Sequence, residues 1–434
     1  MDDGVGLAAT LYEPSAPPPY PAIVLFHGLG GKRQDLDFIA QRWADTFAVL
    51  SVDARGHGQS GGLVSIDGPR EIADTRAIYD WLAARSEIGD RAIGAWGISL
   101  GAGAVLRSLV EGVPWNAVEA VQTWTDLYSA LAPQNLSKSG AVYQFLSSVP
   151  QDRLDPSVLA VKDDALASRN LDKLRQFASE RSSRSRLSQV TTPVYLFQGR
   201  RDFAFDISQA TAGYRLLKGH KRLYVGDFGH APSTFPGPDV NAVLYDGESW
   251  FFRWLVRPPQ RPIRFPVTIA PDPWHGKARR LKRLPATRNL RLTFRGRSSL
   301  RPHDKAVSTS RRLTASTETF GSARIRVTAR LSRGWSRLVA VLTARPPHRK
   351  TIVVSEGGVN TSGLSGTHRL TIRLLDEATL IPRGAKLTLT MASSSVAQDP
   401  GNLLYLDLPM PPKARVVLGP AQLVLPVLRK PISR

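Results

Sequence analysis

The segment Gly97-Ile98-Ser99-Leu100-Gly101 constrains the fold more than any other feature of this chain. An apolar run, Ala92–Trp96, precedes it, and small and apolar residues follow it, so the sequence predicts a strand, a sharp turn and a helix. Glycine on both sides of a serine permits a turn that a Cβ atom would block. Such a turn exposes the serine hydroxyl at the positive end of the helix. We therefore predict that Ser99 is a nucleophile held above a sheet.

The G-x-S-x-G pattern alone is not specific, because Gly58–Gly62 matches it around Ser60. Ser60 follows the turn Arg55–Gly58, and no helix is predicted directly after it. Ser60 is therefore the weaker candidate. A purely structural turn at Ser99, without catalysis, is the other alternative.

Strands and amphipathic helices alternate over residues 1–257. Strands are predicted over Val5–Tyr12, Ala22–Phe26, Phe47–Val52, Ala92–Trp96, Ala117–Thr123, Val194–Phe197 and Leu223–Val225. Helices are predicted over Leu36–Trp43, Arg70–Ala84, Leu100–Val110, Ile207–Leu217 and Val240–Val256. This alternation is typical of an α/β fold with a mostly parallel sheet covered on both faces. Residues 126–190 hold helical segments and no convincing strand, which predicts an inserted helical cap.

The charge changes abruptly near residue 260, in a chain of 434 residues that is long enough for two domains. Residues 1–260 carry a net charge of −2, whereas residues 261–434 carry +24. After the Pro-rich linker Arg257–Pro262 the period becomes two, as in Ala323–Leu331, where apolar residues alternate with Arg and Thr. We predict a catalytic domain over 1–257 and an antiparallel β-sandwich over 265–434.

A serine nucleophile needs a general base and a carboxylate that orients the base, in the chain order Ser, Asp or Glu, His. His230 follows the last predicted strand of the first domain, whereas His220 lies in a basic turn before that strand. Asp202 lies just past the strand Val194–Phe197, at the edge where ligands bind in open α/β sheets. We predict His230 as the base and Asp202 as the acid. Asp206 and Asp126 are the alternative acids, and each could equally be a helix N-cap.

The Gly-rich segment Phe26–Gly31 follows the second predicted strand. A loop of this kind can aim a backbone N–H at a developing oxyanion, so Leu29 and Leu100 are predicted to supply the two donors. His27 is predicted to brace this loop. Trp124 and Tyr128 are candidates for substrate binding, although aromatic residues there are more often packed core.

These residues together resemble the α/β-hydrolase superfamily. The resemblance rests on Phe26-His27-Gly28, Asp53–Ser60, Gly97–Gly101, Gly199–Asp202 and Gly229-His230. The second domain, with Leu380–Leu387, is similar to the C-terminal jelly roll of X-prolyl dipeptidyl-peptidases and cocaine-esterase-like acyl hydrolases. The resemblance implies an α/β-hydrolase fold with a helical cap and a C-terminal jelly-roll sandwich.

The chain departs from that family in the oxyanion region. Proline-selective members generally carry Tyr after the nucleophile, and cocaine-esterase-like members use a Tyr hydroxyl in the oxyanion hole. Here Leu100 and Leu29 stand at those places, so the hole must rest on backbone amides. This favours a carboxylic ester hydrolase acting on a small or polymeric ester. Hydrolysis of X-Pro peptides by the same triad is the alternative.

A function of another class, binding of a polyanion or nucleic acid, is suggested by the basic second domain. No aromatic residues interleave its arginines, so specific nucleic-acid binding is not expected.

The chain has no Cys and no H-E-x-x-H motif, and no metal or cofactor is predicted. No apolar run is long enough to span a membrane. Met1–Gly4 lacks the features of a signal peptide, so we expect a cytoplasmic protein, or a secreted one whose signal is absent from this sequence.

Overall fold

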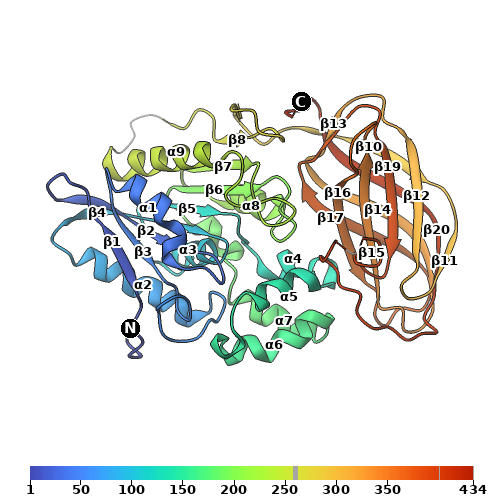
Figure 1. Ribbon diagram of the computed structural model, residues 1–434, viewed down its shortest axis with the longest axis horizontal. Coiled ribbons are helices and arrows are strands. Elements are labelled where there is room, and N and C mark those ends of the chain that lie inside the picture. The colour runs from blue at the N-terminus through green and yellow to red at the C-terminus, as the bar shows by residue number, and fades with distance from the viewer. Residues whose placement is uncertain (258–261, 400, 434) are drawn as a thin grey trace.

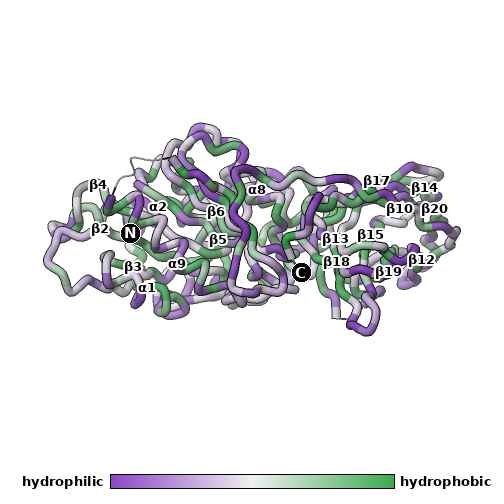
Figure 2. The backbone as a smooth tube through the Cα atoms, turned by 90° about the horizontal axis from the view of Figure 1, so that it is seen from above, coloured by the Kyte–Doolittle hydropathy of each residue, from purple (hydrophilic) through white to green (hydrophobic). Residues whose placement is uncertain are grey.

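The computed structural model describes residues 1–257, 262–399 and 401–433. Figure 1 shows two parts side by side, an α/β part from the N-terminal residues and a β part from the C-terminal residues. Figure 2 shows the same two parts from above, with the long axis of the molecule again horizontal. The predicted linker Arg257–Pro262 lies mostly outside the described residues.

The α/β part is built on one sheet whose described strands have the order β1-β3-β2-β4-β5-β6-β7-β8-β9. All neighbours between β3 and β8 along this order are parallel, and the two edge strands β1 and β9 are antiparallel. Every residue of β3, β5 and β6 is buried, as expected for strands covered on both faces. The strands are β1 Ala9–Tyr12, β2 Tyr20–Phe26, β3 Ala48–Val52, β4 Ile88–Ile98, β5 Ala117–Val121, β6 Val194–Gly199, β7 Lys221–Gly226, β8 Val267–Ile269 and β9 Arg279–Leu281.

Helices cover both faces of this sheet. Apolar residues of α2, α3 and α8 share one core with the sheet, and apolar residues of α1 and α9 share another on the opposite face. The helices are α1 Asp37–Trp43, α2 Pro69–Ala83, α3 Leu100–Val110, α8 Ile207–Leu216 and α9 Val240–Phe251. The predicted α/β fold is confirmed. None of the described helices is long and apolar enough to cross a membrane.

One edge of the sheet differs from the sequence prediction. The prediction that Leu223–Val225 is the last strand was wrong, because β8 pairs with β7 and β9 pairs with β8. The sheet therefore extends past the predicted domain boundary at residues 257–265. Strands of three residues after a Pro-rich segment carry too little periodicity to be recognised.

Residues 126–190 contribute helices and no named strand to the part of the chain that the structure describes. The four α-helices are α4 Leu127–Leu131, α5 Ser139–Ser147, α6 Pro156–Ala167 and α7 Leu171–Ser179. Figure 1 shows them together below the sheet, with α4 and α5 reaching toward the β part.

The C-terminal part is an antiparallel β-sandwich, as predicted. Among the described residues one sheet has the order β10-β20-β14-β17 with β11 on β20, and the other has the order β12-β19-β15-β16. Both sheets bury their inner faces in one core, and the arginines of β14 lie on the exposed face. The jelly-roll topology stays a prediction. The strands are β10 Thr287–Phe294, β11 Ser298–Leu300, β12 Lys305–Arg312, β13 Thr317–Glu318, β14 Gly321–Leu331, β15 Arg337–Arg345, β16 Ile352–Asn360, β17 Gly366–Glu377, β18 Leu380–Ile381, β19 Lys386–Ala392 and β20 Val416–Leu428.

Buried polar contacts join the two parts next to the C-terminal end of β6. Arg200, directly after β6, forms a buried ion pair with Glu318 of β13 and donates to the carbonyl of Ala378 at 2.8 Å. Asp206 accepts a hydrogen bond from the backbone N–H of Asp376 in β17 at 3.1 Å. The sandwich is therefore bound by two residues that lie shortly before and shortly after Asp202 in the chain.

Candidate active site

Ser99 occupies a strained turn between β4 and α3. Its φ is +54° and its ψ is −114°, a conformation that few non-glycine residues adopt. The two flanking glycines are required by packing. A Cβ atom on Gly97 would lie 2.3 Å from the carbonyl oxygen of Gly101, and one on Gly101 would lie 2.2 Å from that of Phe26.

The structure brings Ser99, His230 and Asp202 together although they are far apart in sequence. Ser99 Oγ lies 3.0 Å from His230 Nε2, and His230 Nδ1 lies 2.8 Å from Asp202 Oδ2. This is the chain of contacts through which a base removes a serine proton while a carboxylate fixes the tautomer of the base.

The carboxylate of Asp202 is fully buried and held by backbone donors. Asp202 Oδ1 accepts from the N–H groups of Ala204 and Phe205 at 3.0 and 2.9 Å, and Oδ2 accepts from His230 N–H at 3.2 Å. The rings of Phe145 and Phe205 meet the imidazole of His230 edge-on, with centroids 5.7 and 5.1 Å away. Asp202 and His230 are thus both confined by packing.

Leu29 and Leu100 lie on adjacent segments beside Ser99. Gly101 N–H donates to the carbonyl of His27 at 3.0 Å, which ties α3 to the loop after β2. A Cβ atom on Gly28 would come within 3.5 Å of Ser99 Cβ. Within the described residues, no hydrogen-bond partner is found for the N–H of Leu29 or of Leu100, so both donors are available.

His27 braces the loop that carries Leu29. Its Nε2 accepts the N–H of Ala54 at 3.0 Å, so the proton resides on Nδ1, which lies 2.8 Å from the carbonyl of Gly28. Burial lowers the pKa of His27, and it lowers the pKa of the neighbouring His57 to about 4. Both imidazoles are therefore neutral structural groups at pH 7.

The alternative residues make other contacts. Ser60 Oγ donates to the carbonyl of Asp53 at 2.7 Å, and the ring of His220 packs against that of Trp254 at 4.6 Å between centroids. Asp126 caps α4 through Ser129 N–H, and Asp206 caps α8 through Ser208 N–H. None of these contacts is made with Ser99 or His230.

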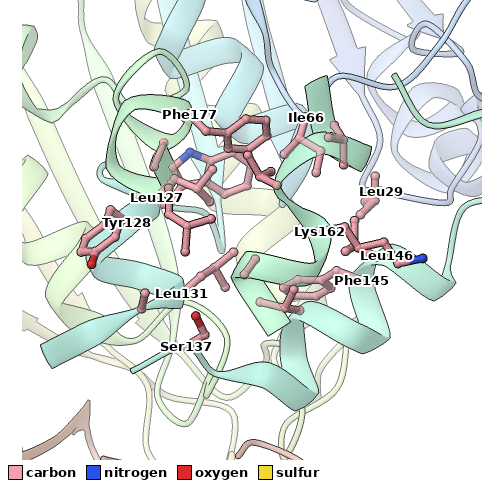
Figure 3. Close-up of a pocket in the computed structure, with 18 of the residues that line it drawn as sticks. Leu29, Ile66, Leu127, Tyr128, Leu131, Ser137, Phe145, Leu146, Lys162 and Phe177 are labelled. Carbon is pink, nitrogen blue, oxygen red and sulfur yellow. The ribbon is translucent and has the colours of Figure 1, made fainter. Parts of the chain in front are cut away.

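An apolar pocket of about 110 Å³ reaches Ser99. Figure 3 shows residues that line this pocket. The cap supplies most of its wall, and the predicted substrate-binding residues Trp124 and Tyr128 both line it. The wall is apolar except for Ser99, Tyr128, Ser137 and Lys162, and it contains no carboxylate among the described residues. Its apolar members are Leu29, Ile66, Leu100, Trp124, Leu127, Leu131, Ala132, Val142, Phe145, Leu146, Val158, Val161, Ala165, Leu174, Phe177, Ala178 and Phe205.

A larger cleft of about 820 Å³ also reaches Ser99, and unlike the apolar pocket it includes His230. It is bounded by the loop after β2, by the segment 230–236 and by residues 401–404 of the sandwich. Helix α5 contacts that last segment so closely that a Cβ atom on Gly140 would lie 1.1 Å from the carbonyl of Leu403. The sandwich therefore forms part of the wall around Ser99.

Several residues at this site were missed from the sequence. Phe145 and Phe205 flank His230, and residues 401–404 come from the second part of the chain. The helical segments predicted within residues 126–190 were the only signal for Phe145. Nothing in the local pattern indicated the loop at 401–404. Within the described residues, no group of three or more His, Asp or Glu side chains is arranged to hold a metal ion.

The fold and the geometry around Ser99 are those of the α/β-hydrolase class. The family model described as X-Pro dipeptidyl-peptidase (S15 family) matches residues 3–232, more than half of the chain. The chain therefore belongs to this family, as its sequence resemblance predicted.

Solved structures with the same fold cover nearly the whole chain. A CocE/NonD family hydrolase from Staphylococcus aureus has a TM-score of 0.75 at 15% identity and covers 99% of this chain and 92% of its own. An α-amino acid ester hydrolase has a TM-score of 0.70 at 15% identity and covers 98% and 95%. An aminopeptidase from a marine sediment archaeon, Thaumarchaeota archaeon, has a TM-score of 0.69 at 14% identity and covers 99% and 95%. The fold of both parts is therefore shared.

Curated relatives match shorter regions. The quorum-quenching protein AidA of Acinetobacter baumannii (strain MDR-ZJ06) is 34% identical over 140 residues, which are 30% of this chain and 44% of the relative. An uncharacterised 31.7 kDa protein of Escherichia coli is 31% identical over 109 residues, 24% of this chain and 38% of the relative. The chain thus spans less than half the length of these relatives.

Proposed function

We propose that this protein hydrolyses carboxylic esters through an acyl-enzyme, with Ser99, His230 and Asp202 as its catalytic triad. The observation that carries the proposal is the continuous set of contacts from Ser99 Oγ through His230 to Asp202, beside an apolar pocket. Ser99 Oγ attacks the ester carbonyl carbon while His230 Nε2 takes its proton. The N–H groups of Leu29 and Leu100 stabilise the oxyanion, and losing one such donor typically costs about 3 kcal/mol of barrier.

His230 fixes the orientation of the substrate. The leaving oxygen must receive its proton from His230 Nε2, so the alcohol part of the ester lies in the cleft that contains His230. The acyl part then lies in the apolar pocket, which reaches Ser99 but not His230. When the C–O bond breaks, the alcohol departs through the cleft. Water activated by His230 then attacks the acyl-enzyme and restores Ser99.

The second candidate is hydrolysis of X-Pro peptides, which the family match favours. A dipeptidyl-peptidase must hold the ammonium group of its substrate, and a carboxylate is the natural partner of a desolvated ammonium. The only charged side chain among the described residues that line the apolar pocket is Lys162, which would repel an ammonium. This supports an uncharged apolar acyl group, and hence an ester.

A fluorophosphonate probe tests the nucleophile. The wild type should be labelled, Ser99→Ala should not be labelled, and Ser60→Ala should be labelled like the wild type. Because Ser60 belongs to the second G-x-S-x-G match, it is the matched control. Labelling that persists in Ser99→Ala contradicts the proposal.

A comparison of substrates then tests which kind of bond the protein hydrolyses. We expect kcat/KM to be higher for a p-nitrophenyl ester of an apolar acid than for an X-Pro p-nitroanilide with a free amino terminus. An amino group added to the acyl part of the ester should lower kcat/KM, because burial next to Lys162 is unfavourable. A faster anilide would instead establish the peptidase, and a gain from the amino group would contradict a preference for an uncharged acyl group.

A further inference from the structure

Lys138 is a buried cation in the cap with no role in the chemistry described above. It precedes α5, its side chain is 1% exposed, and it is absent from the walls of both the apolar pocket and the cleft. Its Nζ donates to the carbonyl oxygens of Phe203 and Ala204, each at 2.9 Å. A buried ammonium is costly unless it is paired, so these two contacts require an explanation.

The two carbonyl groups belong to the same peptide units that hold Asp202. The unit joining Phe203 to Ala204 presents its carbonyl to Lys138 and its N–H to Asp202 Oδ1. The unit joining Ala204 to Phe205 does the same. Two aligned peptide dipoles therefore bridge the ammonium of Lys138 and the carboxylate of Asp202.

Both peptide dipoles are oriented favourably toward the charge at each of their ends. The C=O ends point to a positive charge and the N–H ends point to a negative charge, and hydrogen bonds in such a chain strengthen one another. A shift of the segment 203–205 would break contacts with Lys138 and with Asp202 together. We propose that Lys138 is a positioning residue that fixes Asp202, and through it His230, by way of these two peptide units.

Other charges around Lys138 are consistent with a retained ammonium. Burial lowers the pKa of Lys138, whereas the carboxylates of Asp206, Glu377, Asp202 and Glu356 oppose that shift. These groups come from the α/β part and from the sandwich. The ammonium therefore lies where the cap, the segment after Asp202 and the sandwich meet.

The inference rests on the proposed triad, and a double-mutant cycle tests it. Lys138→Met keeps a long unbranched side chain and removes the charge and the donors. We expect kcat for a p-nitrophenyl ester to fall about 100-fold, because misplacement of a catalytic group by about 1 Å has an effect of that size. KM should change less than about twofold, because Lys138 lines neither substrate region.

In an Asp202→Asn background the same substitution should lower kcat by less than about threefold, because the carboxylate that it positions is already absent. Equal losses in both backgrounds, or a rise in KM with kcat unchanged, would show a purely structural role and overturn the inference. Failure of the proposed function is separate, because it would appear as labelling that persists in Ser99→Ala.

Two further variants keep the test decisive. If Lys138→Met does not fold, Lys138→Gln keeps one amide donor and should show a smaller loss of kcat with the same dependence on Asp202. Arg337→Met is the matched control, because Arg337 is a buried cation that donates to the carbonyls of Ser393 and Leu408 inside the sandwich. It should lower Tm and leave kcat unchanged. Equal kcat losses in the Lys138 and Arg337 variants would contradict the inference.

Discussion

At the scale of single residues, the role of Asp202 can be distinguished from that of Asp206, which lies four positions further along the chain. Asp202 contacts His230 Nδ1, whereas Asp206 caps α8 and binds the backbone of β17. We predict that Asp202→Asn lowers kcat by about 10⁴-fold, because an amide no longer selects the imidazole tautomer that accepts the serine proton. Steady-state kinetics with a p-nitrophenyl ester measures the effect.

Asp206→Asn is the control for this prediction, because asparagine is also a good N-cap and Asp206 makes no contact with His230. It should keep kcat within a few-fold of the wild type. A loss in Asp206→Asn as large as that in Asp202→Asn would mean that the acid has been assigned to the wrong carboxylate.

At the scale of elements, the turn between β4 and α3 depends on a close approach to β2. A Cβ atom on Gly101 would meet backbone carbonyls of Phe26 and His27 at 2.2 and 2.6 Å, and a backbone cannot rotate away as a side chain can. We predict that Gly101→Ala displaces α3 from β2, moves Leu100 N–H relative to Leu29 N–H and lowers kcat at least about 100-fold. Gly6→Ala, where a Cβ atom would meet nothing within 4 Å, should change neither kcat nor Tm. Normal turnover by Gly101→Ala would contradict the prediction.

The elements around Ser99 could be predicted because each leaves a local signal. The glycines around Ser99, the apolar run before Asp202 and the loop before His230 follow the order of the chain, and the parallel sheet brings their ends to one edge. Lys138 and Phe145 could not be predicted. Their significance comes from contacts with residues 203–205 and His230, more than 60 positions away, which no period or motif encodes.

At the scale of the whole molecule, the basic charge lies on exposed strand faces. Arg324, Arg326 and Arg330 of β14 are exposed. Ile325 and Val327, which alternate with them, are buried, as the period of two predicted. Polyanion binding by this face stays a prediction. The sequence predicted the sandwich, but its contact with the cap and with the segment after β6 depends on three-dimensional packing between distant segments.

The contact between the sandwich and the cap buries carboxylates, and this makes the free energy of unfolding depend on pH. Burial raises the pKa of Glu356 from its usual 4.5 to about 7, opposed by hydrogen bonds from Ser395 and Asn402. A carboxyl whose pKa is raised by folding stabilises the folded state fully below pH 4.5, and this contribution is lost as the pH rises to about 7. The loss is on the order of 3 kcal/mol.

Glu356→Gln removes this titration and keeps an oxygen that can accept from Ser395 and Asn402. We therefore predict that the Tm difference between Glu356→Gln and the wild type grows in favour of the variant between pH 4.5 and pH 7. The growth should be about 6–12 °C, since 1 kcal/mol shifts Tm by about 2–4 °C in a domain of this size. Differential scanning calorimetry at several pH values measures it, with the exposed Glu13→Gln as control. A Tm difference that does not change with pH would mean that Glu356 is ionised at neutral pH, with Lys138 then close enough to compensate its charge.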